Sequence, residues 1–212
     1  MKRALIMVDV QNDFMPGGAL PTGDGAQVVP VFNRLQPLFD FVVATQDWHP
    51  ASHGSFASNH PGRKAGEIID LDGLPQILWP DHCVQGTRGA EFHRNLDRSH
   101  ILRIVQKGTD PAIDSYSAFF DNGRRKSTGL EGELRGNAVT DLYVGGLATD
   151  YCVLWSVRDA VMLGFRTHVI RDACRGVELQ PGDIERAFAE MESLGSQILT
   201  SAETVRELTA TA

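Results

Sequence analysis

One cysteine of this chain follows two glycines, at the point where a predicted strand ends and a predicted helix begins. Residues 142–144 are apolar, and apolar residues at helical spacing follow Cys152. We expect Thr149 or Asp150 to cap the helix, which places Cys152 in its first turn. Backbone N–H groups and the positive end of the helix dipole stabilise a thiolate there, and the thiolate is the form that attacks carbonyl carbons. Cys152 is therefore a candidate nucleophile, although free cysteines are also common in protein cores.

Two further predicted strands carry charged residues at or near their ends. Asp9 interrupts an apolar run, and Lys107 closely follows another. Carboxyl ends of parallel strands lie at one edge of a sheet, so Asp9, Lys107 and Cys152 are expected to converge. Asp9 would act as general base and later return the proton to a leaving amine, while Lys107 would hold the thiolate and the carboxylate by its charge. Backbone N–H groups of Ala148 and Cys152 would form an oxyanion hole.

A second constellation combines one carboxylate with two imidazoles. Asp47 and His49 are two residues apart, so on an extended strand end their side chains point to the same side. His82 follows a turn that Pro80 constrains. Such a set with open positions suits a divalent transition metal, although a lone Asp-x-His pair is usually structural. The other histidines are expected on the surface or in packing roles, with His53 the least certain: His53, His60, His93, His100 and His168.

Composition limits the classes of protein that the chain can represent. Its 212 residues, 42% of them hydrophobic, fit one domain over 1–212. The net charge of −7 argues against nucleic acid or an anionic membrane surface as partner. Three cysteines are too few for a disulfide framework, so we expect a reducing, cytoplasmic location. Asp9 interrupts the first apolar run too early for a signal peptide, and we expect no membrane-spanning segment.

The elements that must position these residues alternate along the chain. Apolar runs predict strands at 4–10, 41–45, 101–105, 139–145, 167–170 and 197–199, and helical spacing predicts helices at 26–39, 130–135, 151–163 and 183–194. This alternation predicts an α/β fold, a doubly wound and mostly parallel sheet with helices on both faces. The segment at about 46–100 breaks the rhythm and is expected to be an irregular insertion that carries the metal site.

Several segments in order resemble the cysteine amidohydrolases of the isochorismatase-like superfamily, and within it the bacterial nicotinamidases. They are VDVQNDFMPGGAL from Val8, TQDWHPASHGSFAS from Thr45, LWPDHCVQGTRGAEFH from Leu78, QKGTDPAIDSYSAFFDN from Gln106, GLATDYCVLWSVRDA from Gly146 and IRDACRGV from Ile170. The resemblance implies that the family's triad falls on Asp9, Lys107 and Cys152. It implies that the family's metal ligands fall on Asp47, His49 and His82.

The resemblance also implies a cis peptide bond before Ala148 and a pyridine pocket with aromatic walls at Phe14 and Trp79 and a third at Tyr116. Where some members have an additional His or Glu ligand, this chain has Ser55. Ser55 would lie close to the metal or contact it through water. One divalent ion per chain is expected, with zinc favoured and iron or manganese also compatible.

The implied activity is hydrolysis of nicotinamide to nicotinate and ammonia through a cysteine thioester, in NAD salvage, with pyrazinamide as a further substrate. Two alternatives remain open at this point. One is a related cysteine amidohydrolase that acts on an N-carbamoyl or ureido compound, and the other is a non-catalytic α/β protein that binds a metal or ligand. A small-molecule partner is expected in either case, and a homo-oligomer is left open.

Overall fold

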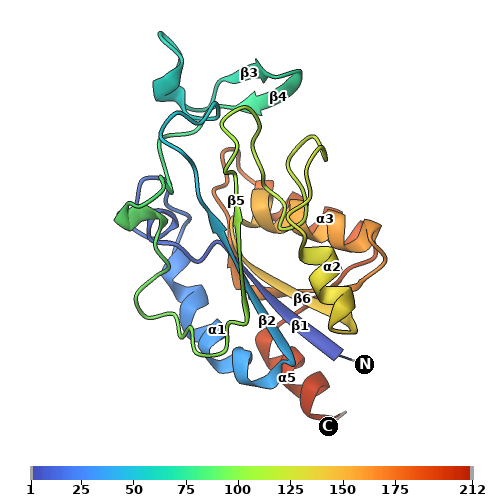
Figure 1. The fold of residues 1–212 in the computed structure, drawn as a ribbon. Helices are drawn as coiled ribbons and strands as arrows, with labels where there is room; N and C mark the ends of the chain where they lie inside the picture. The colour runs from blue at the N-terminus through green and yellow to red at the C-terminus, as the bar shows by residue number, and fades with distance from the viewer. Residues whose placement is uncertain (1, 211–212) are drawn as a thin grey trace.

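The structure is a computed structural model that describes residues 2–210. A six-stranded sheet forms its centre, and all of its strand pairings are parallel (Figure 1). The strands lie in the order β5-β2-β1-β6-β7-β8, and they are β1 (Lys2–Val8), β2 (Phe41–Asp47), β5 (Arg103–Lys107), β6 (Val139–Leu147), β7 (Arg166–Arg175) and β8 (Gln197–Leu199). The predicted strands are therefore present, and the fold is the predicted α/β class.

Helices cover both faces of this sheet. They are α1 (Val28–Leu35), α2 (Leu130–Gly136), α3 (Leu154–Met162), α4 (Asp183–Ser193) and α5 (Ser201–Ala210). Short 3-10 turns lie at Asn12–Phe14, Gly25–Gln27, Gln36–Leu38, Ala57–Asn59 and Arg88–Ala90. Among residues 2–210, no helix is long and apolar enough to cross a membrane.

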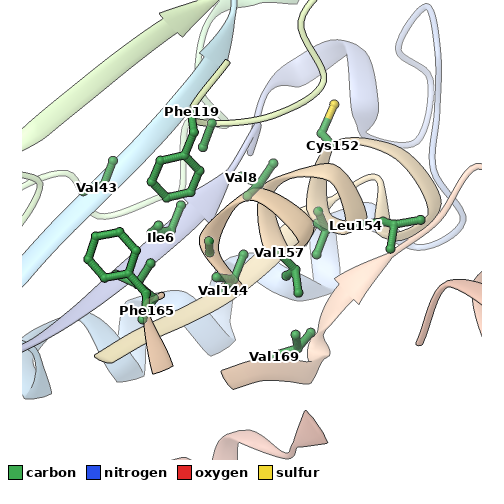
Figure 2. Close-up of a cluster of buried hydrophobic side chains, with 14 of the residues drawn as sticks. Ile6, Val8, Val43, Phe119, Val144, Cys152, Leu154, Val157, Phe165 and Val169 are labelled. Carbon is green, nitrogen blue, oxygen red and sulfur yellow. The ribbon is translucent and has the colours of Figure 1, made fainter. Parts of the chain in front are cut away.

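The side chains of β1 alternate between two apolar clusters, one on each face. Ala4, Ile6 and Val8 join the cluster that contains apolar residues of α2, α3 and α4 (Figure 2). Leu5 and Met7 point to the other face and pack with residues of α1 and α5. Because successive strand residues point to opposite faces, a run without polar residues is what a strand buried on both sides requires.

Two parts of the fold were not predicted. The segment at 46–100 contains an antiparallel hairpin, β3 (Ile68–Leu71) and β4 (Leu74–Ile77), and α5 follows β8. Both elements leave much of their surface in solvent, so their sequences carry weak apolar periodicity. The first strand was predicted to reach Val10, but it ends at Val8 because Asp9 has a left-handed backbone with φ of 49°.

The order of the strands creates a switch point between β1 and β6. From β1 the sheet grows through β2 to β5 on one side, and from β6 through β7 to β8 on the other. Ligands of doubly wound sheets bind beyond the carboxyl ends of the strands at such a point. Asp9 follows β1 there, and Cys152 lies shortly after β6.

Candidate active site

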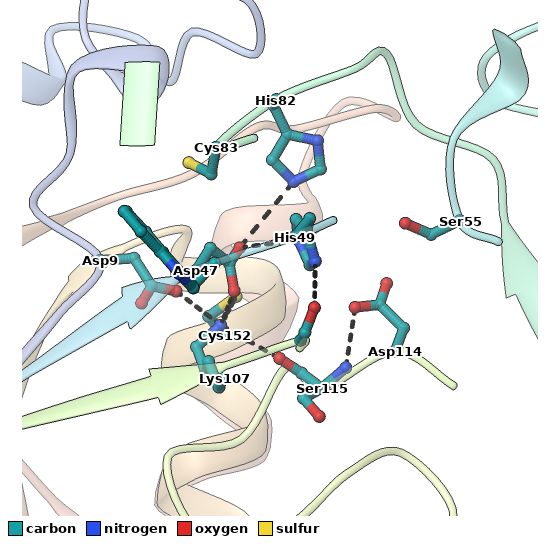
Figure 3. Close-up of polar contacts among 12 residues, drawn as sticks. Asp9, Asp47, His49, Ser55, His82, Cys83, Lys107, Asp114, Ser115 and Cys152 are labelled. Carbon is teal, nitrogen blue, oxygen red and sulfur yellow. Dashed lines mark hydrogen bonds and ion pairs between the residues drawn. The ribbon is translucent and has the colours of Figure 1, made fainter. Parts of the chain in front are cut away.

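Lys107 brings the three candidate catalytic residues together. Its Nζ lies 2.8 Å from Asp9 Oδ2 and 3.3 Å from Cys152 Sγ (Figure 3). Lys107 is the last residue of β5, and its ammonium also donates to the backbone carbonyl of Ser115 at 3.1 Å. All three candidates are buried. The expected convergence at the carboxyl edge of the sheet is therefore what the structure shows.

Close packing of β1 against β6 sets the position of Asp9. Gly146 has φ of 132°, and a Cβ on it would lie 2.1 Å from the carbonyl oxygen of Val8, so only glycine fits. The chain leaves the strand at Asp9, and Thr45 of β2 forms two hydrogen bonds with this residue. The Thr45 hydroxyl donates to Asp9 Oδ1 at 2.5 Å and accepts from the Asp9 N–H at 3.1 Å. Sequence reasoning missed Thr45 because it resembles any β-branched strand residue.

Burial of Cys152 favours a neutral thiol over a thiolate. Burial raises the pKa of Cys152 well above its usual value, and Lys107 opposes this shift while Asp9 and Asp47 add to it. Burial also raises the pKa of Asp9 to about 6, against the attraction of Lys107. The expectation that the helix start stabilises a thiolate was therefore wrong, because burial opposes the charged form and two carboxylates add to this effect against one ammonium. Asp9 ionised above pH 6 remains suited to accept the thiol proton.

The helix after β6 begins differently from the prediction. A π-helical turn over Thr149–Val153 precedes α3, and the carbonyl of Ala148 accepts the N–H groups of Tyr151 and Val153, both at 3.1 Å. No side chain caps this turn. The carboxylate of Asp150 instead accepts the backbone N–H groups of residues 177 and 178 at 3.0 and 2.8 Å. The predicted cap at Thr149 or Asp150 was wrong, although Cys152 does lie in the turn that starts the helix.

The peptide bond between Leu147 and Ala148 is cis, as the resemblance implied. Ala148 and Cys152 both line one pocket at the carboxyl edge of the sheet. Their N–H groups as an oxyanion hole remain a prediction.

Three buried side chains of the predicted metal set lie within reach of one another. His49 Nε2 is 3.6 Å and His82 Nε2 is 3.8 Å from Asp47 Oδ2, and the possible ligand atoms of the three residues all lie within 4.8 Å of one another. The other ring nitrogens are held by backbone carbonyls, His49 Nδ1 by Gly108 and His82 Nδ1 by Pro80, both at 2.8 Å. Each imidazole thus turns Nε2 toward the carboxylate, an orientation typical of metal-binding histidines.

The backbone next to each of the two histidines supports this orientation. Gly108 has φ of 64°, and a Cβ there would lie 2.3 Å from His49 Cε1, so glycine leaves room for the ring. Next to His82, the N–H of Cys83 donates to Asp13 Oδ2 at 2.7 Å. Sequence reasoning missed Asp13, whose carboxylate gives no local signal that it contacts a residue 70 positions away.

Asp47 joins the two constellations. One carboxylate oxygen forms an ion pair with Lys107, and the other faces both imidazoles (Figure 3). Burial alone would raise the pKa of Asp47, but Lys107 and His49 hold it below its usual range. Burial and the neighbouring His49 lower the pKa of His82, whereas Asp47 raises the pKa of His49 in spite of burial. A metal that binds both imidazoles takes the place of a proton on them. A carboxylate with two imidazoles therefore fits a divalent transition metal.

Ser55 lies outside this three-residue set. Its hydroxyl is 2.7 Å from His53 Nδ1, and the His53 ring is 4.3 Å from that of His49. His53 also forms a second group of close ligand atoms with His49 and Asp114. A contact of Ser55 to a metal, direct or through water, remains a prediction. Of the other histidines, His168 is buried and stacks on Tyr143, whereas the remaining three are partly or fully exposed: His60, His93 and His100.

The predicted aromatic walls line the same pocket as Cys152 and the metal set. Phe14, Trp79 and Tyr116 all contribute to it. The Tyr116 hydroxyl accepts a hydrogen bond from Trp79 Nε1 at 3.0 Å, so Tyr116 orients the Trp79 ring. Sequence reasoning missed four further lining residues, which come from separate loops and share no spacing: Leu20, Asp114, Tyr151 and Val177.

Comparisons with known proteins find several that are similar to this chain over most of its length. The nicotinamidase of Escherichia coli K12 is 51% identical over 205 residues, which cover 95% of this chain and 96% of that protein. The structure of an Acinetobacter nicotinamidase/pyrazinamidase superposes with a TM-score of 0.92 at 46% identity, covering 96% and 98% of the two chains. A Pyrococcus horikoshii pyrazinamidase solved in complex with zinc has a TM-score of 0.75 at 38% identity, covering 94% and 99%. The family model of the isochorismatase domain matches residues 3–203, and the chain belongs to this family.

Proposed function

We propose that this chain is a nicotinamidase that hydrolyses nicotinamide to nicotinate and ammonia through a thioester on Cys152. One observation carries the proposal. Lys107 contacts Asp9, Cys152 and Asp47 at once, so a nucleophile, a base and a candidate metal ligand share one buried cation at one pocket. The similarity to the E. coli nicotinamidase supports the same activity.

The first half of the reaction forms the thioester. Asp9 takes the proton of Cys152 as the sulfur attacks the carboxamide carbon, because the thiol is neutral at rest. N–H groups of Ala148 and Cys152 stabilise the oxyanion that develops on the carbonyl oxygen. Asp9 then donates its proton to the amide nitrogen, the C–N bond breaks, and ammonia leaves.

The second half releases the acid. Asp9, ionised again, accepts a proton from water as the water oxygen attacks the thioester carbon. The C–S bond breaks, the thiol of Cys152 recovers its proton from Asp9, and nicotinate leaves. Lys107 stays charged throughout, because Asp47 and Asp9 raise its pKa well above the usual value in spite of burial.

The metal set and the aromatic walls would determine which substrate binds. Phe14 and Trp79 would pack against the two faces of a flat aromatic ring. Asp47, His49 and His82 would hold one divalent ion, zinc in our proposal, which supplies a Lewis-acid anchor for a pyridine nitrogen. Ser55 would contact this ion directly or through water.

Neither alternative has comparable support. The comparisons favour nicotinamidases over hydrolases of N-carbamoyl or ureido compounds. The complete set of Asp9, Lys107 and Cys152 argues against a protein that only binds a ligand. Free thiols at all three cysteines agree with the cytoplasmic location that we propose for this step of NAD salvage.

Ammonia release from zinc-loaded protein tests the proposal. Nicotinamide and pyrazinamide should both be hydrolysed, and an N-carbamoyl amino acid should not. Preference for the carbamoyl compound would overturn the nicotinamidase assignment, and no release from any of the three would overturn catalysis.

A further inference from the structure

Gln11 is a fully buried residue that lies between two residues of the site without lining its pocket. It follows Asp9 by two positions and precedes Phe14 by three. Its carboxamide forms three hydrogen bonds, all with backbone groups. Nε2 donates to the carbonyls of Asp47 at 2.8 Å and Ala90 at 2.9 Å, and Oε1 accepts from the N–H of Asp47 at 2.8 Å.

These bonds stand where strand pairing stops. β1 and β2 pair from Ala4 opposite Phe41 to Met7 opposite Ala44, and β1 ends at Val8. β2 continues to Asp47, which pairs with Lys107 on its other side. On the side of β1, the amide of Gln11 supplies the donor and the acceptor that a neighbouring strand would otherwise offer to Asp47.

We propose that Gln11 is a positioning residue for Asp47. By holding both backbone groups of Asp47, it directs one carboxylate oxygen toward Lys107 and the other toward the two imidazoles. This inference rests on the proposed function, since it takes Asp47 as a metal ligand. A carboxylate that serves two partners tolerates little displacement, because a shift that improves one contact lengthens the other.

Gln46 offers a matched control in the same environment. It is the neighbour of Asp47, is 8% exposed, and donates through Nε2 to the same Ala90 carbonyl at 2.8 Å. Its Oε1 accepts from Gln106 at 3.2 Å. It forms no side-chain hydrogen bond with the backbone of Asp47, so it differs from Gln11 in the contact that the proposal concerns.

The test compares Gln11→Met with Gln46→Met. Zinc affinity is measured by competition with a chelator, the rate of Cys152 alkylation is followed across pH, and thermal unfolding reports stability. Gln11→Met should weaken zinc binding about 10–100-fold, as loss of a group that orients a ligand does, and should move the alkylation profile. Gln46→Met should leave zinc affinity and the alkylation profile near those of the wild type.

Equal zinc affinities in the two variants would overturn the proposal even if both lose stability. If Gln11→Met does not fold, Gln11→Glu replaces it, since glutamate keeps the acceptor for the Asp47 N–H and loses the donor to two carbonyls. Failure of both Gln11 variants to fold while Gln46→Met folds would contradict a role confined to Asp47. A wild-type protein that binds no zinc would instead overturn the metal site itself.

Discussion

The strand ends and the irregular segment hold their parts of the site by different means. Lys107 ends β5, and the hydrogen-bond ladder with β2 places its backbone. Asp9 directly follows β1, and Thr45 of β2 fixes both its N–H and its carboxylate. His49 and His82 lie in a segment with little regular structure. Single bonds to backbone carbonyls orient their rings.

This difference matches the two roles that we propose, catalysis for the residues at the strand ends and substrate binding for those of the irregular segment. Groups that transfer protons and form the thioester need fixed distances, which a ladder provides. Groups that bind the aromatic ring of a substrate lie on loops, and loops can vary in sequence and conformation. Asp47 belongs to both regions, as the last residue of β2 and as the nearest carboxylate to the two imidazoles.

Removing the nucleophile should give the largest effect. Cys152→Ala should lower kcat by about 10⁴-fold or more, because no other group can form the thioester. Ammonia release measures it, and zinc content should be unchanged if the two regions act separately. Cys174→Ser is the control, since Cys174 is also buried but its thiol contacts backbone groups, as donor to the carbonyl of Ile170 and as acceptor from Gly146. An active Cys152→Ala protein would refute the assignment.

Lys107→Met should come next, with a loss of about 10²–10⁴-fold in the rate of thioester formation. Without the ammonium, Asp9 and Asp47 repel each other and the thiolate. Alkylation of Cys152 should therefore require a higher pH than in the wild type. A wild-type alkylation profile in Lys107→Met would mean that Lys107 does not act on the thiol.

Loss of a metal ligand tests the other region. Asp47→Ala, His49→Ala and His82→Ala should each lower metal content markedly from about one ion per chain, as elemental analysis would show. His60→Ala, outside the site, should retain the metal. His53→Ala should retain it too. Loss of metal in His53→Ala would favour the group of His49, His53 and Asp114 instead.

The smallest expected effect is a gradual dependence on pH. With the pKa of Asp9 raised to about 6, the base is protonated below pH 6, and kcat/KM should fall about tenfold per pH unit there. Protonation of Asp9 would not lower kcat/KM by unfolding the protein. A carboxyl with a raised pKa binds its proton more tightly in the folded state, so its protonation between pH 6 and 4 favours folding. A flat profile from pH 7 to 5 would contradict Asp9 as base.

Residues at strand ends could be predicted from the sequence, whereas contacts between distant segments could not. Asp9, Lys107 and Cys152 could be predicted because each interrupts or follows an apolar run, and parallel strands bring such points together. His49 and His82 followed from ligand chemistry and from the family resemblance. Contacts between distant segments could not be predicted, because a side chain that binds remote backbone, as Gln11 does, leaves no local pattern.

The electrostatics of the site was the other feature that could not be predicted from the sequence. The helix start around Cys152 predicted a thiolate, yet burial and the two carboxylates favour the thiol. The cap was wrong for a related reason, since Asp150 binds backbone N–H groups of a later loop. Both outcomes depend on neighbours that only the fold brings together.

The ratio of kcat/KM for nicotinamide to that for benzamide tests most directly whether the two regions act on one substrate. Benzamide keeps the carboxamide that Cys152 attacks and lacks the ring nitrogen. In the zinc-loaded wild type we expect nicotinamide to be preferred by about 10⁴-fold, since a polar site left unpaired costs far more than an apolar contact. In His82→Ala the preference should shrink. Equal rates for the two amides in the wild type would contradict the account.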